Sequence, residues 1–349
     1  MPVTDVVETL NDGIAAQSRG ELDEAIRLYS EVIAVSGAPP AIVARAFTNR
    51  GRIYWERGRY DDAITDSDSA LHYQRDFAEA LNVRGNAFRE KGEYQRAIAD
   101  YGDAIRFKPD YAEAFENRGN AYESDGSYDS AILDYESAIR LKRDYYEVFN
   151  SLGNARRYKA RFDHEVQLDR AIAAYDEAIR LQPDYAEAFS NRGVAKLYCR
   201  SASSALDDFL TAARLAPDDP YNVIWLHIAR SRLGQPDADE LNNSAARIPP
   251  NKWPSPVIAL FRCLETSAAV EAAAAVVDEN TRRGQVCEAH FYIGIFELER
   301  GALERARYHF LKAVKGCPKG FVEYDAAHAE LARTAALLEY QTRITIPSG

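Results

Sequence analysis

The stretch FAEALNVRGNAFREKGEYQRAIADYGDAIRFKPD at residues 77–110 decides the fold, because a second version of it follows without a gap. Residues 111–144 read YAEAFENRGNAYESDGSYDSAILDYESAIRLKRD, and the unit returns at 185–218. A fixed period of 34 residues is typical of solenoids, in which each unit packs on its neighbours. We expect six units, starting at residues 6, 44, 78, 112, 146 and 186. Two insertions, near residues 37–40 and within 161–170, should fall between helices.

Small and aromatic residues recur together in each unit. In the unit from Ala112 the recurring positions are Phe115, Arg118, Gly119, Tyr122, Tyr128, Ala131, Tyr135 and Ala138. This pattern resembles the tetratricopeptide repeat (TPR) family, except that Arg118 stands where that family usually has Leu. The resemblance implies an all-α fold, a right-handed superhelical solenoid of helix pairs A and B with a concave face. It also implies that the glycine of helix A faces an alanine of helix B, and that a second alanine admits the next helix A.

Glycine and proline mark the expected helix ends. Gly58, Gly92 and Gly126 stand where helix A should end, since glycine accepts the left-handed conformation of a C-cap. Pro109, Pro183 and Pro217 stand where helix B should end, because proline cannot continue a helix. Each unit is therefore predicted to be a pair of short helices.

One pair of charged positions appears and vanishes together. Four units have Arg at the seventh position and Asp at the twenty-third, whereas the fifth unit has Leu152 and Ala174. The four pairs are Arg50 with Asp66, Arg84 with Asp100, Arg118 with Asp134 and Arg192 with Asp208. We expect a salt bridge from helix A to helix B in each of these units, with both side chains facing water as the alternative.

Three regions are predicted. Residues 1–219 form the array of six repeats, and 220–256 form a degenerate repeat and a Pro-rich junction, in which Trp253 should anchor the linker. Residues 257–349 begin with a helical segment at 257–280, regain one further repeat at 287–320, and end in a capping helix at 321–340. Strings such as DPYNVIWLHIAR and CEAHFYIGIFELERG resemble the C-terminal region of bacterial TPR adaptor lipoproteins, but the lipid-acceptor cysteine of those proteins is missing.

Charge and cysteine content restrict the partners and the compartment. The net charge of −11 is concentrated in residues 1–219, which disfavours nucleic acid and anionic membrane. No run of apolar residues is long enough to span a membrane. The start, MPVTDVVETLNDG, lacks the features of a secretion signal, so we expect a cytoplasmic protein. The four cysteines are widely spaced, and we expect reduced thiols.

A search for catalytic and cofactor motifs finds no phosphate-binding loop, nucleophile elbow, HExxH or EF-hand sequence. The best metal candidate is Cys287 with His290, one helical turn apart, joined by His309 and Cys317. Their places in the repeat favour ordinary packing instead. We predict no cofactor, no metal and no catalytic residue.

The remaining candidate is a surface. In TPR proteins the concave face is lined by helix A at spacings of four, three and four residues. The predicted partner-binding groove comprises Arg45, Asn49, Arg52, Glu79, Asn82, Asn86, Glu113, Asn117, Asn120, Glu147, Asn154, Tyr158, Glu187 and Asn191. Asn suits bonding to an extended peptide because its amide both donates and accepts hydrogen bonds. The alternative is that a solvated helical face simply holds polar residues.

We therefore predict a non-enzymatic scaffold or adaptor that binds a protein or an extended peptide in the concave groove. Asn86 and Asn117 match two positions of the TPR domains that clamp a chaperone's C-terminal carboxylate, but the cationic positions hold Asn82, Glu147 and Ser151. That ligand is excluded, and the row of glutamates favours a basic segment instead. The alternative function is a ligand sensor or enzyme with a site in 220–256, around Trp225, His227 and Trp253.

Overall fold

The computed structural model describes residues 3–160, 164–199, 201–250, 252–276, 278–318 and 321–345. Over these ranges the regular secondary structure is entirely helical, in 19 helices. The predicted all-α class is confirmed. The chain forms two compact units, Met1–Val148 and Phe149–Gly349, and the predicted regional boundaries at 219 and 256 stay predictions.

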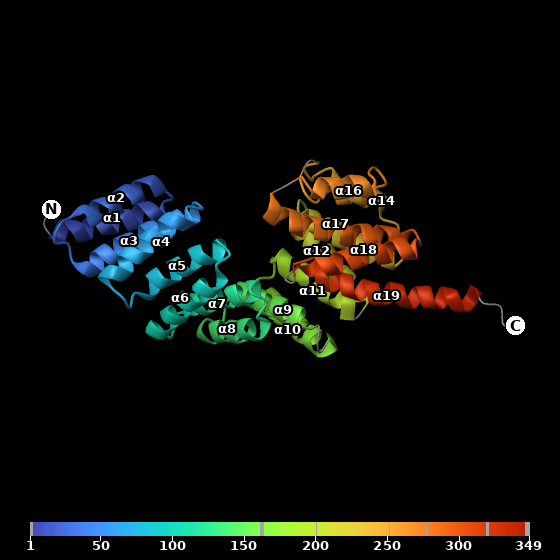
Figure 1. Ribbon diagram of the computed structural model, residues 1–349, viewed down its shortest axis with the longest axis horizontal. Coiled ribbons are helices and arrows are strands. Elements are labelled where there is room, and N and C mark those ends of the chain that lie inside the picture. The colour runs from blue at the N-terminus through green and yellow to red at the C-terminus, as the bar shows by residue number, and fades with distance from the viewer. Residues whose placement is uncertain are drawn as a thin grey trace. The chain divides into compact units, whose positions relative to one another are not determined.

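The first unit is a row of antiparallel helix pairs, each packed on the next (Figure 1). Its helices are α1 (Val3–Ser18), α2 (Leu22–Ala34), α3 (Pro40–Glu56), α4 (Tyr60–Tyr73), α5 (Ala78–Glu90), α6 (Tyr94–Phe107), α7 (Ala112–Ser124) and α8 (Tyr128–Leu141). Odd-numbered helices correspond to helix A and even-numbered helices to helix B of the predicted units. The helix α9 (Tyr146–Lys159) begins in this unit and ends in the second.

The packing partner of the helix A glycine differs from the prediction in most units. A Cβ added at Gly119 would lie 2.7 Å from Cε1 of Tyr135, a side chain that is fully buried. Gly85 meets Tyr101 in the same way, so in these units the glycine faces an aromatic ring. Gly51 is the exception, because its added Cβ would lie 3.3 Å from the backbone oxygen of Ala63, the alanine that was predicted. The second alanine behaves as predicted, since Ala104 packs in one cluster with Ala114 of the next helix A.

The predicted helix ends are confirmed. Gly58, Gly92 and Gly126 have φ values of 73°, 75° and 81°, directly after a helix A. The helix α6 ends at Phe107, and its C-cap, Lys108, is the residue before Pro109. The backbone therefore turns where the sequence indicates.

All four predicted Arg–Asp bridges are present. Arg118 donates from Nε to Oδ2 of Asp134 at 2.7 Å and from Nη2 to Oδ1 at 2.7 Å. Across the four pairs the Asp side chains are only 5–9% exposed and the Arg side chains 17–24%. Burial raises the pKa of Asp66 and Asp100, and the hydrogen bonds from the Arg partners oppose that shift. The solvent-facing alternative is wrong.

The second unit continues with helix pairs and ends in a long helix (Figure 1). Its remaining helices are α10 (His164–Leu181), α11 (Ala186–Cys199), α12 (Ala202–Leu215), α13 (Pro220–Arg232), α14 (Ala238–Ala245), α15 (Ser255–Phe261), α16 (Ser267–Ala274), α17 (Glu279–Glu299), α18 (Leu303–Gly316) and α19 (Val322–Thr345).

Three expectations fail in this unit. The insertion at 161–170 does not lie wholly between helices, because α10 begins at His164; residues 161–163 are outside the described ranges. The expected helix at 257–280 is two short helices, broken near Cys263, which has φ of 56°. Cys287 and Cys317 are not reduced thiols but form a disulfide between the start of the last repeat and its end.

Candidate partner-binding face

Two predicted groove asparagines of the first unit bond to each other. Asn117 Nδ2 donates to Asn82 Oδ1 at 3.1 Å, and Asn82 Nδ2 donates to Glu113 Oε1 at 3.1 Å. Asn82 is 1% exposed and Asn117 9%. These bonds join α5 to α7, so the two amides hold neighbouring A helices together and have little surface to offer a partner.

The same arrangement of Asn–Asn and Asn–Glu hydrogen bonds recurs in the second unit. Asn191 Nδ2 donates to Asn150 Oδ1 at 3.0 Å, and Asn150 Nδ2 donates to Glu187 Oε1 at 3.0 Å. The sequence analysis missed Asn150, although it stands at the same position of its unit as Asn82. Repetition of that asparagine is the signal that could have identified it.

The asparagines at the ninth position are oriented by tyrosines of helix B. Tyr101 donates to Oδ1 of Asn86 at 2.6 Å and Tyr135 to Oδ1 of Asn120 at 2.7 Å. Burial raises the pKa of Tyr101, which keeps the phenol protonated as a donor. Asn154 accepts from its tyrosine, Tyr175, in the same way at 2.8 Å. Among the described residues no acceptor meets the Nδ2 of these three amides. Asn86 is 5% exposed, whereas Asn120 and Asn154 are half-buried and are therefore available as oriented donors.

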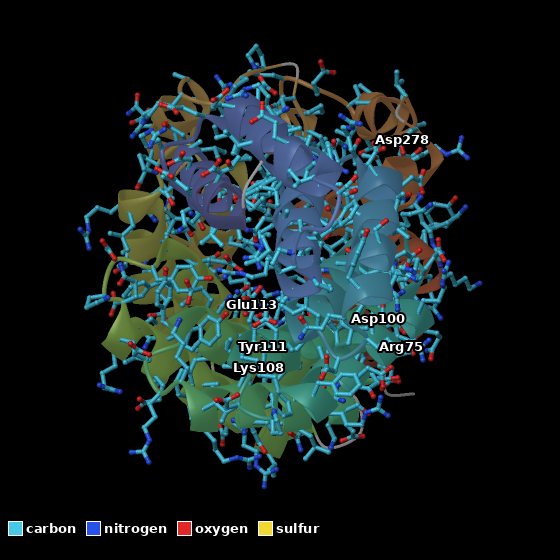
Figure 2. All side chains as sticks on the ribbon, turned by 90° about the vertical axis from the view of Figure 1, so that its left-hand side faces the viewer. Arg75, Asp100, Lys108, Tyr111, Glu113 and Asp278 are labelled. Atoms are coloured by element: carbon cyan, nitrogen blue, oxygen red, sulfur yellow. A yellow bond between two sulfur atoms is a disulfide. The ribbon has the colours of Figure 1, made fainter. Side chains whose placement is uncertain are left out.

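The charged groove positions of the first unit are partly neutralised. Lys108 Nζ lies 2.7 Å from Glu79 Oε1 and 4.5 Å from the ring centre of Tyr111, and Figure 2 shows Lys108, Tyr111 and Glu113 close together. Arg45 is exposed, whereas Asn49, Arg52 and Glu147 are half-buried. The row of glutamates is thus not a row of free carboxylates, because Glu79, Glu113 and Glu187 already accept hydrogen bonds.

A cleft of about 340 Å³ opens in the second unit beside two predicted groove residues. It is lined by Glu187, Ser190, Asn191, Val194, Asp219, Tyr221, Trp225, Glu288, Phe321, Val322 and Glu323. Every charged residue in this lining is acidic. We call these residues the acidic cleft. The helices α11, α13 and α17, the start of α19, and the residues directly before α13 and α19 supply them.

Two carboxylates of the acidic cleft are buried together. Glu288 is 8% exposed and Glu323 5%, and they accept hydrogen bonds from Tyr221 and Tyr292 at 2.8 and 2.7 Å. Burial and the neighbouring Glu323 raise the pKa of Glu288 to about 7, against opposing hydrogen bonds from Trp253 and Tyr221. Burial likewise raises the pKa of Glu323. A positive group in the cleft would relieve this electrostatic cost.

The last helix borders the predicted groove of the second unit. A mostly apolar cavity of about 400 Å³ is lined by Val194 and Tyr198 of α11 and by Ala326 and Ala329 of α19. In the second unit α19 therefore faces α11 one and two helical turns after the predicted groove residue Asn191, in addition to packing on α18. Tyr158, a predicted groove residue, is only 8% exposed.

The divergent region around Trp225, His227 and Trp253 is used for packing and ion pairing. Trp225 is 3% exposed and lies among aromatic rings, 5.8 Å from Phe291 between ring centres. Trp253 Nε1 donates to Glu288 at 2.7 Å, so it anchors the junction to α17 as predicted.

His227 lies between two carboxylates. Its Nδ1 is 2.7 Å from Asp237 Oδ2, and its Nε2 is 3.5 Å from Glu299 Oε2. Burial lowers the pKa of His227, but the two carboxylates outweigh it and raise the pKa to about 9. This histidine is therefore a cation that joins α13 to α17 and to the residue before α14.

The four residues considered as metal ligands from the sequence fall into two separate groups in the structure. The disulfide takes Cys287 and Cys317, whereas His290 and His309 meet each other and Glu271. Burial lowers the pKa of both histidines, which favours neutral imidazoles. Glu271, from α16, was not a candidate in the sequence because it lies 19 residues before His290.

Family patterns match along most of the chain. A pattern described as "Tetratricopeptide repeat" matches residues 10–72 and 259–321, and another of that description matches 112–145. A third, described as "TPR repeat", matches 85–126 and 167–197. The chain is a tetratricopeptide repeat protein. TPR units form protein-interaction solenoids, and their short repeats build extended concave surfaces.

Solved TPR structures resemble the chain over about half of its length or more. The PilF protein of Pseudomonas aeruginosa is 19% identical, with a TM-score of 0.53, and the match covers 62% of this chain and 94% of that one. A structure of MamA is 26% identical over 52% of this chain and 94% of its own, with a TM-score of 0.41. YrrB, described as "a TPR protein with an unusual peptide-binding site", is 20% identical over 56% and 95%, with a TM-score of 0.45. The similarity to PilF supports the fold.

Among the described residues of this TPR protein, no helix has the length and apolar character needed to cross a bilayer.

Proposed function

We propose that this TPR protein is a non-catalytic scaffold that binds an extended segment of a partner protein on its concave faces, with a basic side chain of that segment in the acidic cleft. The observation that carries the proposal is the cleft itself. Its charged lining, of which Glu187 and Glu323 are examples, is wholly acidic, and it adjoins Asn191 at a predicted groove position.

The size and chemistry of the acidic cleft fit a lysine or arginine side chain. A volume of about 340 Å³ exceeds what one such side chain occupies, and Tyr221, Trp225 and Phe321 provide aromatic surface for its alkyl stem and charge. Glu288 and Glu323 are buried next to each other without a Lys or Arg among the lining residues. A bound cation would therefore gain more here than at an exposed surface glutamate.

The oriented asparagines supply the complementary backbone contacts. Tyr135 holds the Oδ1 atom of Asn120 in the first unit and Tyr175 that of Asn154 in the second, which leaves each Nδ2 to donate to a peptide carbonyl. Because the tyrosines fix the amides before binding, little side-chain entropy is lost when a peptide docks. Such donors recognise any sequence, so specificity for a basic residue comes from the acidic cleft.

Binding of a fluorescent peptide of alternating Ser and Lys, measured by anisotropy, tests the proposal. Glu187 is exposed, so Glu187→Lys should fold and weaken binding about tenfold, equivalent to about 1.4 kcal/mol. The variant Glu187→Gln keeps an acceptor for Asn150 and removes only the charge, and it should show a smaller loss.

Glu304→Lys is the matched control, because Glu304 is 74% exposed on α18 and lies outside the acidic cleft. It changes the net charge as much as Glu187→Lys but should leave the affinity within about twofold, since exposed charges act weakly at a distance. Equal losses in the two variants would mean that only net charge attracts the peptide, and the acidic cleft would lose its role.

A further inference from the structure

We propose that Glu271, His290 and His309 form a binding site for one divalent transition-metal ion of the Zn²⁺ type. The site is distinct from the acidic cleft and lies where the short helix α16 meets the last repeat, α17 and α18. Two imidazoles and one carboxylate are the ligand set of zinc sites that keep a further coordination position open.

The separations of the three ligand atoms match those around one ion. His290 Nδ1 lies 3.2 Å from His309 Nδ1, and Glu271 Oε1 lies 3.5 and 3.7 Å from these two nitrogens. Zinc bonds nitrogen and oxygen at about 2.0–2.2 Å, so a tetrahedral ion holds its ligand atoms roughly 3.3–3.6 Å apart. A single ion could therefore contact all three atoms after small shifts.

A disulfide joins the two helices that carry the histidine ligands. His290 follows Cys287 by one helical turn, and the disulfide from Cys287 to Cys317 ties α17 to the residue after α18. The side chains of His290 and His309 are 15% and 11% exposed, whereas Glu271 is 43% exposed. The imidazoles are thus fixed beforehand, and the carboxylate is reachable from solvent, which gives an ion a route of entry.

Comparison of the repeats shows that His309 differs from the residue at the same position in other units. It occupies the twenty-third position, where four other units have the aspartate of the Arg–Asp bridge. The seventh position of its own unit is Ile293, which has no donor for it. The histidine is therefore freed from the structural role of that position, and it meets another histidine instead of an arginine.

Charged residues near His290 and His309 have opposite effects on the protonation of the imidazoles. Lys312 disfavours positive charge at both histidines, and Glu297 favours it at His309. Arg305 already pairs with Glu297 at 2.8 Å, so that acid is largely neutralised. The simpler role of the cluster, a hydrogen bond between two neutral imidazoles, needs no metal and is the competing outcome of the test.

Calorimetric titration of ZnCl₂ into the full chain, previously dialysed against a chelator and kept non-reduced, tests the site. One Zn²⁺ per chain should bind wild type, and CoCl₂ should give the visible absorption of a four-coordinate ion with nitrogen and oxygen ligands. Glu271→Gln should weaken Zn²⁺ binding by more than about tenfold, and His290→Gln should do so as well, because each removes one ligand.

His72→Gln is the matched control, because His72 is exposed in the first unit and should leave Zn²⁺ binding unchanged. Glu271→Gln decides the test even if a histidine variant unfolds, since its side chain is half-exposed and helicity by circular dichroism verifies the fold. Absence of a one-to-one site in wild type would overturn the proposal, as would a site of unchanged affinity in both Glu271→Gln and His290→Gln.

Discussion

The Arg118–Asp134 bridge allows a sharp test of how the repeats are stabilised. Arg118 forms two bonds of 2.7 Å with Asp134 and has no other hydrogen-bond partner among the described residues. Arg84 and Arg192, by comparison, also bond to a helix of the preceding unit. The Arg118–Asp134 pair can therefore be removed without breaking a further hydrogen bond, although Arg118 also lies 5.7 Å from the ring centre of Phe115.

The size of the effect follows from burial. Asp134→Ala leaves a guanidinium that is 22% exposed without its two acceptors. Removing one partner of a buried pair costs about 3–5 kcal/mol, and partial access to water should reduce this to about 2–4 kcal/mol. The double variant Arg118→Leu/Asp134→Ala copies Leu152 and Ala174 of the fifth unit, and we expect it to cost less than about 1 kcal/mol.

Urea unfolding of the full chain, followed by circular dichroism, measures these changes through the midpoint and slope. The exposed pair Arg106–Asp103, at 66% and 49% exposure on the neighbouring helix α6, is the control. Its loss should cost less than about 0.5 kcal/mol. A double variant as destabilised as the sum of its single variants would refute the reasoning, because the pair would then have no coupling energy.

Two further predictions concern single side chains. The pKa of His227, about 9 when folded and near 6.5 when unfolded, implies stabilisation that is complete below pH 6.5 and lost as pH rises through 9. His227→Gln should therefore lose up to about 3 kcal/mol of unfolding free energy at pH 6 and far less at pH 9.5, and an equal loss at both values would contradict the charge assignment. Tyr101→Phe should cost about 1–2 kcal/mol in the same urea assay because Asn86, 5% exposed, loses its donor. No change would indicate that water replaces the phenol.

The repeat architecture was predictable because it depends on residues that recur. The glycine at the end of helix A, as at Gly58 and Gly92, and the Arg–Asp pair both recur in several units. The units can therefore be compared with one another within this one sequence. The packing of the helix A glycine was predicted wrongly for most units, because small residues on two helices do not show which ones meet. The large ring of Tyr135 takes the space that Gly119 leaves.

The surface was less predictable than the fold. Asn82 and Asn117 have the polarity of a binding surface but are buried by each other, and helix periodicity alone does not distinguish the two cases. The position of α19 over α11 and the meeting of Glu271 with His290 depend on contacts between distant segments. The cytoplasmic location, the adaptor resemblance and the partner stay predictions.

Photo-cross-linking can show whether the acidic cleft receives a basic side chain. A Ser-Lys peptide with a photoreactive residue next to one lysine is irradiated with the protein, and mass spectrometry locates the attachment. We expect attachment around Ser190 and Phe321 in wild type, strongly reduced in Glu187→Lys and retained in Glu304→Lys. Attachment confined to surfaces away from the cleft, or unaffected by Glu187→Lys, would contradict this expectation.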